Sequence, residues 1–460
     1  MASGYSGRMT PGERKAAGWL ACLASLRTLG LFMILPVFAL YAETLRHTTP
    51  ALLGLAIGVY GFSQALLQIP FGMLSDRYGR KRLIVLGLVI FALGSVVAAV
   101  ADSIWGVIAG RALQGAGAVS AAVMALAADL TREEQRTKAM AVIGLSIGLA
   151  FAASMVLGPV LNGWIGVAGI FWLTAVLALG GILVVRFLVP QPAHSRPHRD
   201  SGPMPEQLFR VITDPQLLRF NAGILVLHML LTATFVALPL ALRDQAGLAA
   251  DRHWQVYLPA LALSLAIMVP LVLVAEKRRC LKPVFLGAIL LLCLTQLGLL
   301  NAHFHLLAIG ALLTLFFAAF NLLEAMLPSL ISRMAPVDAR GTAMGVYTSS
   351  QFLGAFIGGA AGGWMMGTFG LNGAFAFAAV AALVWLLFAW TMKNPRYLSS
   401  YLLNVGVVSE AEAQRLAMRL TQVRGVAEAV VIAVEGVAYL RVDRHALDEP
   451  ALLAFAAAEA

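Results

Sequence analysis

The chain has 460 residues, of which 60% are hydrophobic and only 12% are charged, with a mean hydropathy of +0.84. Soluble domains carry about 25% charged residues, so these values exclude a soluble globular protein and predict a polytopic membrane protein. The net charge of +10 does not indicate a nucleic-acid partner, because the basic residues gather in loops between apolar runs. Cys22, Cys280 and Cys293 show neither metal-ligand spacing nor a disulfide pattern, and we expect no metal and no cofactor.

Apolar runs long enough to cross a bilayer occur twelve times along the chain. The first is too long for the apolar part of a signal peptide, so we expect it to remain as a spanning helix. In chain order the runs are 16–42, 50–73, 83–101, 104–128, 138–162, 166–189, 219–242, 254–275, 283–300, 304–331, 341–367 and 371–392.

The loops between these runs differ in charge on the two sides of the membrane. One set contains nearly all the lysines and arginines, as in 77–82 and 132–138, whereas the other holds only Arg46, Arg243 and Arg252. Because basic loops stay in the cytoplasm, we expect both termini on the cytoplasmic side.

The two halves of the chain repeat each other with a period of about 200 residues, as expected for internal symmetry in a transporter. Pro70 and Asp76, for example, are matched by Pro270 and Glu276. The predicted fold is an all-α polytopic membrane protein with twelve transmembrane helices in two pseudo-symmetric six-helix halves. The expected parts are an N-terminal bundle (1–189), a proline-rich cytoplasmic linker (190–218), a C-terminal bundle (219–396) and a further domain (397–460).

The tail over 397–460 differs from the rest because it is acidic and less apolar. Ser409 and Glu412 form a capping box that predicts a helix, strands are expected over 426–434 and 437–442, and a second helix over 447–458. The order β-α-β-β-α predicts a small ferredoxin-like α/β domain. We expect it to dock on the chain's own basic cytoplasmic loops, and its role is either assembly or ligand sensing.

A dense group of charges, in the sequence GMLSDRYGRKR over 72–82, separates the second and third apolar runs. It resembles the loop signature G-x-L-x-D-R-x-G-R-K of the major facilitator superfamily, and the resemblance implies a membrane transporter. It also implies that Asp76 faces the start of the eleventh spanning helix and that Arg80 lies near Asp129, which closes the fourth. These contacts would latch the two halves together. The implied gating residues are Gly72, Asp76, Arg77, Gly79, Arg80 and Asp129.

Two further segments sharpen the resemblance. RALQGAGA over 111–118 resembles the fourth-helix motif R-x-x-Q-G-x-G-A, and GPVLNG over 158–163 resembles the antiporter motif G-P-x-x-G-G, with Asn162 in place of a glycine. With the linker and the tail, the whole chain is similar to YajR-type transporters, which are grouped with proton-driven drug antiporters. The resemblance implies a multi-pass protein of the bacterial inner membrane that is not an enzyme.

Ionisable side chains inside apolar runs are candidates for function, because burying them in a bilayer is costly. Arg27 lies ~16 Å, and His228 and Glu324 lie ~13 Å, from the cytoplasmic ends of their helices. Glu324 is the first candidate for the proton carrier and His228 the second. Arg27 is a counter-charge or an anion contact, or else forms a static ion pair with Glu324. Arg111 matches a family arginine linked to proton transduction, and its alternative role is helix packing.

The expected substrate-cavity residues are the polar side chains of the spans: Gln64, Gln68, Gln114, Asn162 and Asn321. The sequence and the resemblance together predict proton-coupled efflux of lipophilic or cationic small molecules by alternating access. Two alternatives remain, proton-coupled uptake of a metabolite and a transporter-like sensor that is read out by the C-terminal domain. Neither a nucleophile–base pair nor a phosphate-binding G-x-x-x-x-G-K-[ST] loop points to an enzyme.

Overall fold

The computed structural model describes residues 9–191, 204–302, 305–336, 339–392, 399–406, 409–433, 436–443 and 446–456. The chain divides into two compact units, Met1–Ser332 with Ala339–Met392, and Arg333–Asp338 with Lys393–Ala460. Most of the predicted linker, at 192–203, and the expected start of the tail domain lie outside the described residues.

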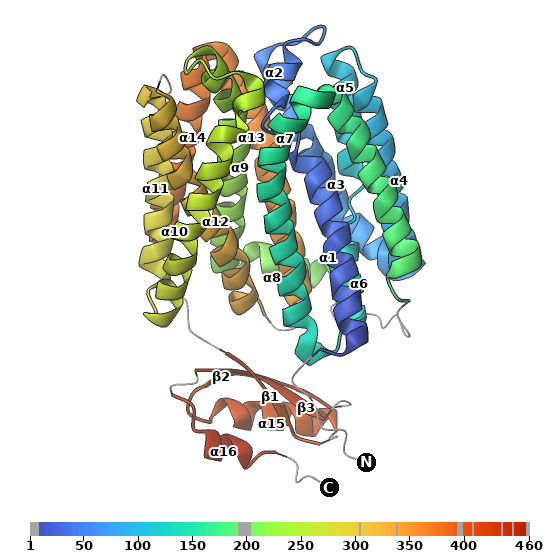
Figure 1. The fold of residues 1–460 in the computed structure, drawn as a ribbon. Coiled ribbons are helices and arrows are strands. Elements are labelled where there is room, and N and C mark those ends of the chain that lie inside the picture. The colour runs from blue at the N-terminus through green and yellow to red at the C-terminus, as the bar shows by residue number, and fades with distance from the viewer. Residues whose placement is uncertain are drawn as a thin grey trace. The chain divides into compact units, whose positions relative to one another are not determined.

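The first unit consists of long helices that run side by side in two halves (Figure 1). The N-terminal half comprises α1 (Pro11–Phe32), α2 (Phe38–Ala42), α3 (Pro50–Tyr78), α4 (Arg80–Ala99), α5 (Ile104–Ala116), α6 (Ser120–Asp129) and α7 (Glu133–Leu183). The C-terminal half comprises α8 (Met204–Thr213), α9 (Pro215–Asp244), α10 (Trp254–Lys277), α11 (Leu281–Ala302), α12 (Leu306–Met334), α13 (Arg340–Phe369) and α14 (Leu371–Trp390).

The number of membrane crossings follows from helix length and composition. Ten helical stretches of the described chain are long and apolar enough to cross a membrane. One of them, Lys138–Leu188, has 51 residues and would be ~77 Å long, more than twice the ~30 Å of a hydrocarbon core. Gly166, with φ 67°, breaks it into two crossings. With α1, which packs on α7, the twelve predicted crossings are accounted for.

Local sequence fixes where several of these helices begin. Thr10 and Glu13 form a capping box at α1, and the side chains of Thr49 and Asp214 accept first-turn N–H groups at α3 and α9. The first predicted run is nevertheless interrupted, because α1 ends at Phe32 and a turn containing Pro36 precedes α2. With these bounds His228 lies near the middle of α9 and Arg27 lies five residues before the end of α1.

The two halves meet closely along α3 and α13. A Cβ atom on Gly54 would lie 2.1 Å from the carbonyl oxygen of Gly359, and one on Gly58 would lie 2.7 Å from that of Phe356, so the helices approach at a distance that only glycine permits. Both glycines lie in the first turns of α3, near the end of the bundle that we call the Glu43 end. We call the opposite end, which carries 77–82 and 132–138, the basic end.

A salt bridge joins the halves at the Glu43 end. Arg243 Nη1, at the end of α9, lies 2.6 Å from Glu43 Oε2, which follows α2, and α2 packs on α9. Together with the glycine contacts of α3, this bridge closes the bundle at the Glu43 end.

The second unit contains a three-stranded antiparallel sheet in the order β1-β3-β2, from β1 (Ser399–Asn404), β2 (Val426–Ile432) and β3 (Val437–Val442). Its helices are α15 (Glu410–Thr421) and α16 (Glu449–Leu453), and the predicted order β-α-β-β-α is confirmed. Leucines from the strands and both helices, including Leu403, Leu420, Leu440 and Leu452, form its core. The second helix is shorter than predicted, since the chain turns at Ala454–Ala456.

One buried arginine of this unit binds backbone carbonyls at the end of α12 and directly after it. Arg441 on β3 is 5% exposed, and its Nη2 donates to the carbonyl oxygen of Ala335 at 2.6 Å. Its Nη1 donates to the carbonyl oxygen of Arg333, and its Nε lies 3.5 Å from Glu428 Oε2. The residues just after α12 therefore belong structurally to the sheet.

Candidate functional site

The charged loop between α3 and α4 is organised around Arg80. Gly79 has φ 96° and ψ 133°, a conformation that side chains strongly disfavour, and it allows α4 to start directly after α3. The side chain of Arg80 is only 4% exposed; its Nε lies 3.2 Å from Asp129 Oδ2 and its Nη1 donates to Ser75 Oγ at 2.8 Å. Arg80 also pairs with Asp76, so the contact expected between Arg80 and Asp129 is present.

The expected latch to the other half is not made. The side chain of Asp76 is 47% exposed, and its described partner is Arg80 rather than the start of α13. Arg77 lies over the ring of Tyr78, with 5.5 Å from its guanidinium carbon to the ring centre, and Gly72 faces Ala121 of α6. Among the described residues, the halves are joined by a salt bridge at the Glu43 end, and Asp76 at the basic end pairs within its own half.

The N-terminal half buries a polar cluster around Arg27 of α1. Arg27 Nη1 donates to Ser120 Oγ at 2.5 Å, and its Nη2 donates to Tyr60 Oη at 2.6 Å and to Gln64 Oε1 at 2.8 Å. Gln64 Nε2 in turn donates to Gln68 Oε1 at 3.1 Å. Gln64 and Gln68 are 0% and 2% exposed, so this chain of hydrogen bonds runs through the interior of the half.

Arg111 of α5 lies on the other side of Tyr60. Its guanidinium carbon lies 5.2 Å from the centre of the Tyr60 ring, and its Nη1 donates to Gln114 Oε1 at 3.0 Å. Nε and Nη2 donate to the carbonyl oxygens of Ala56 and Ile57 on α3, both at 3.4 Å. This geometry is that of the helix-packing alternative, and the role of Arg111 in proton transfer stays a prediction.

The C-terminal half holds a second cluster, around Glu324 of α12. Gln351 Nε2, on α13, lies 3.3 Å from Glu324 Oε1 and 2.8 Å from His228 Nε2. His228 Nδ1 lies 3.9 Å from Glu324 Oε2, and neither of these two atoms has a hydrogen-bond partner among the described residues. The Glu324 side chain is 37% exposed although it lies mid-helix, whereas its Oε2 atom is buried.

The two clusters are neighbours but do not form the ion pair considered from the sequence. Arg27 binds neutral groups, and no bond between Arg27 and Glu324 occurs in the described part of the chain. The ring of Tyr60 lies 6.1 Å from that of Phe352, and the residue before Phe352 is Gln351. The hypothesis of a static Arg27–Glu324 pair is therefore wrong for this conformation.

The other predicted cavity residues lie elsewhere. Gln114 Nε2 donates to Ser95 Oγ at 2.7 Å within the N-terminal half, and Asn321 Nδ2 donates to Ser264 Oγ at 3.2 Å, which links α12 to α10. Asn162 is half-buried on α7 and joins neither cluster in the described contacts.

Two residues of the Arg27 cluster were missed in the sequence. Tyr60, Gln64 and Gln68 recur every four residues, which places them on one face of α3, and this spacing would have identified Tyr60. Ser120 gives no such signal, because a small hydroxyl in an apolar run is common.

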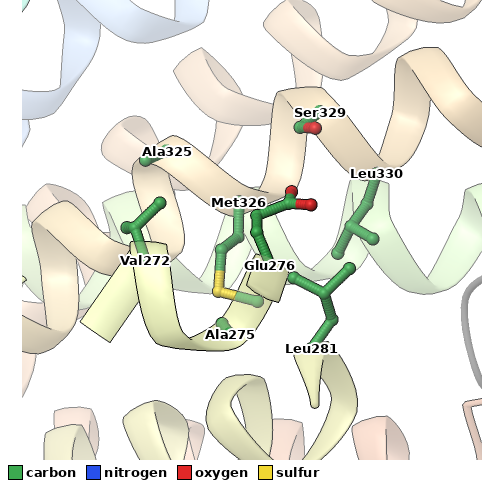
Figure 2. A pocket seen from close by; sticks show the side chains of 8 residues that line it. All are labelled: Val272, Ala275, Glu276, Leu281, Ala325, Met326, Ser329 and Leu330. Carbon is green, nitrogen blue, oxygen red and sulfur yellow. The ribbon is translucent and has the colours of Figure 1, made fainter. Parts of the chain in front are cut away.

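A separate small cavity lies between α10 and α12 towards the basic end (Figure 2). Its volume of about 190 Å³ is less than the ~300 Å³ typical of drug-sized ligands, and its walls are mainly apolar. Figure 2 shows the Glu276 carboxylate directed towards Ser329, and Glu324 is not part of the lining. The lining residues are Val272, Ala275, Glu276, Leu281, Ala325, Met326, Ser329 and Leu330.

The sequence matches the Major Facilitator Superfamily over residues 20–279 and 273–406. The chain belongs to this superfamily. It is 48% identical over 438 residues to the inner membrane transport protein YajR of Escherichia coli K12, covering 95% of this chain and 96% of that protein. It is also 27% identical to the multidrug resistance protein MdtH of Yersinia pestis, over 75% of this chain and 84% of that protein.

Solved structures of the superfamily share the fold. A bacterial homologue of the human lysosomal transporter Spinster, in an inward-facing and occupied conformation, matches with a TM-score of 0.69 and 14% identity, over 83% of this chain and 97% of that one. Membership in the superfamily makes this protein a transporter. No group of three or more potential metal ligands occurs in the described part of the chain.

Proposed function

We propose that this transporter exports lipophilic or cationic small molecules from the cell in exchange for protons, by alternating access across the inner membrane. The observation that carries the proposal is the Glu324 cluster: a partly exposed mid-membrane carboxylate with one oxygen that no described donor satisfies. The relative MdtH is a multidrug resistance protein, and the relative YajR is an inner-membrane transport protein. Both support an exporter in that membrane.

The chemistry of the proposed exchange follows from the position of Glu324. An uncompensated carboxylate in a membrane is costly, so it favours either a proton or a cationic substrate at the same place. Gln351 donates to Glu324 and to the imidazole of His228, and this second bond leaves His228 neutral with its proton on Nδ1. In this tautomer the Nδ1–H group lies 3.9 Å from Glu324 Oε2, so a small side-chain movement would let His228 donate a hydrogen bond that stabilises the deprotonated carboxylate.

The proposed cycle alternates closure of the two ends of the bundle. The present conformation joins Arg243 to Glu43 and leaves Asp76 without a partner on α13. In the opposite conformation we expect Asp76 to meet the positive end of the α13 dipole and the Glu43 bridge to break. With the basic end in the cytoplasm, as the loop charges predict, the present conformation faces inwards.

The experiment that tests the proposal uses energised inverted membrane vesicles and a fluorescent reporter of lumenal pH. A panel of lipophilic cations and neutral drugs is added to vesicles with the wild type, Glu324→Gln or Asp102→Asn. Asp102 is a matched control because its side chain is 74% exposed and pairs with Arg46 outside the proposed site. Proton release triggered by a compound should occur with the wild type and Asp102→Asn and be lost with Glu324→Gln.

Two results would contradict the proposal. Unchanged proton release in Glu324→Gln would remove Glu324 from coupling. Compound movement in the same direction as protons would instead favour proton-coupled uptake.

A regulatory role for the C-terminal domain has one supporting observation. Arg441 donates to the carbonyl groups of Arg333, in the last turn of the helix that carries Glu324, and of Ala335, which follows that helix. Such a contact would let a ligand on the domain bias the movement of α12. Deleting 397–460, or replacing Arg441 with Gln, should then change transport or its salt dependence. If both variants transport like the wild type at every salt concentration, the domain serves assembly only.

A further inference from the structure

Arg27 is a half-buried cation inside α1 without a counter-charge among the described residues. Its partners are the hydroxyl groups of Ser120 and Tyr60 and the amide oxygen of Gln64. The buried Arg80, in contrast, meets two carboxylates. An unpaired charge within a bilayer is costly. An arginine without a fixed carboxylate partner would therefore be stabilised by an anion that binds transiently.

Arg27 also retains an N–H group that has no hydrogen-bond acceptor among the described residues. A guanidinium offers five N–H groups, and Arg27 makes three hydrogen bonds within the described structure. Its Nε is buried and has no acceptor there. Arg111, on the opposite face of Tyr60, adds a second positive charge, but its own N–H groups bind backbone carbonyls and Gln114. Arg27 is therefore the arginine of this pair that has a donor to offer.

The opposite half presents an acid in the same region. Tyr60, which binds Arg27, contacts the ring of Phe352, and the preceding residue Gln351 binds Glu324. Glu324 Oε2 lacks a donor just as Arg27 Nε lacks an acceptor. A molecule that lies between the halves would meet a hydrogen-bond donor with positive charge on one side and an acceptor with negative charge on the other.

A chain of ring contacts connects the two halves near these groups. The ring of Phe151, on α7, lies 4.9 Å from that of Phe32 and 6.1 Å from that of Phe320. The ring of Phe320 lies 5.6 Å from that of His228. These rings connect α1 of one half to α9 and α12 of the other and suit an apolar body between two charged ends.

We propose that the transported molecule is a small zwitterion with an apolar body, whose anionic group binds Arg27 while its ammonium group replaces the proton at Glu324. This inference rests on the proposed function and narrows its substrate class from cations to compounds that also carry a carboxylate or a phosphate-like group. Such a molecule neutralises both unpaired charges at once and draws the two halves together.

The test measures anion binding to the purified full-length protein by thermal stabilisation in detergent. The probes share one ring: 3-phenylpropanoate, phenylphosphonate, 2-phenylethylamine and phenylalanine. The proteins are the wild type, Arg27→Gln, Arg27→Lys and the control Arg46→Gln, whose side chain is 75% exposed. At least one anionic probe should stabilise the wild type and Arg46→Gln saturably, and its apparent Kd should rise about ten- to hundredfold in Arg27→Gln.

The carboxylate and phosphonate probes identify which anionic group is preferred. Arg27→Lys keeps the charge but loses the planar fork, so its affinity should be intermediate, and it serves as the test variant if Arg27→Gln does not fold. Failure of every anionic probe on the wild type, or equal stabilisation of the wild type and the tested Arg27 variant, overturns the inference. Proton release by 2-phenylethylamine depends on Glu324 and not on Arg27, so the proposed exchange and the zwitterion inference fail separately.

Discussion

Arg80 and its two acidic partners, Asp129 and Asp76, should contribute very unequally to stability, because their exposures differ. Replacing Arg80 with Gln removes both its charged hydrogen bond to the Asp129 carboxylate, which is 3% exposed, and its pairing with Asp76, so the change should cost about 2–4 kcal/mol. Asp129→Asn leaves Arg80 its contact with Asp76 and should cost about 1.5–3 kcal/mol, the value of a hydrogen bond to a charged group. Asp76→Asn removes a partner that is 47% exposed and should cost about 0–1 kcal/mol.

Equilibrium unfolding of the purified variants in mixed micelles of mild detergent and sodium dodecyl sulfate measures this order. Arg46→Gln is the control, since both side chains of the Arg46–Asp102 pair are about three-quarters exposed. An Asp76→Asn variant as unstable as Arg80→Gln would refute the reasoning, because it would mean that exposure does not determine the value of these contacts. Asp76→Asn should still slow transport, since we expect Asp76 to act in the opposite conformation.

Three further predictions concern single sites. Arg243→Gln removes the bridge between Arg243 and Glu43, whose side chains are 35% and 45% exposed, so it should change the free energy of unfolding by at most about 1 kcal/mol. The same variant should increase chemical labelling of cysteines placed at the Glu43 end. Unchanged labelling would argue against a gate there. Gly79→Ala forces a side chain into φ 96° and should destabilise the protein by about 1–3 kcal/mol in the same micelle assay, whereas a neutral effect would show that the turn relaxes. Glu13 precedes the first predicted span, and hydrogen bonds from Arg132 lower its pKa to about 2 from 4.5, so its stabilising effect is complete above pH 4.5 and is lost as the pH falls towards 2. The stability difference between the wild type and Glu13→Gln should therefore shrink over this range, and a constant difference would contradict the assigned contact.

The number of membrane crossings and the order of elements in the tail domain could be predicted from the sequence, because both depend on local patterns of residues. Long apolar runs and capping residues such as Thr10 and Asp214 define helices with little help from tertiary contacts. The boundary between the spans 138–162 and 166–189 was predicted and coincides with the break at Gly166, whereas the break after Phe32 was missed because hydrophobicity continues across that turn. Such breaks are decided by backbone angles that hydropathy does not record.

The candidate site was only partly predictable for a related reason. Depth along a helix places Arg27, His228 and Glu324 within α1, α9 and α12, but it does not reveal the direction in which each side chain points. Arg27 was therefore open to pairing with Glu324, whereas it binds Tyr60 and Ser120 within its own half. The rotation of α1 about its axis, which decides this, follows from packing on α7 and has no signature in the sequence.

The distribution of ion pairs separates the charges that hold the fold from those available for transport. At the ends of the bundle Arg80, Arg132 and Arg243 all meet carboxylates. In the middle, where an unpaired charge is most costly, Arg27 and Glu324 bind neutral groups and each keeps one unsatisfied atom. If these charges served packing alone, a direct pair between them would remove both penalties, and the structure does not use it. A proton or a substrate that neutralises these charges therefore gains binding energy in this conformation. A ligand can shift an alternating transporter only if it binds one of its conformations more tightly than the other.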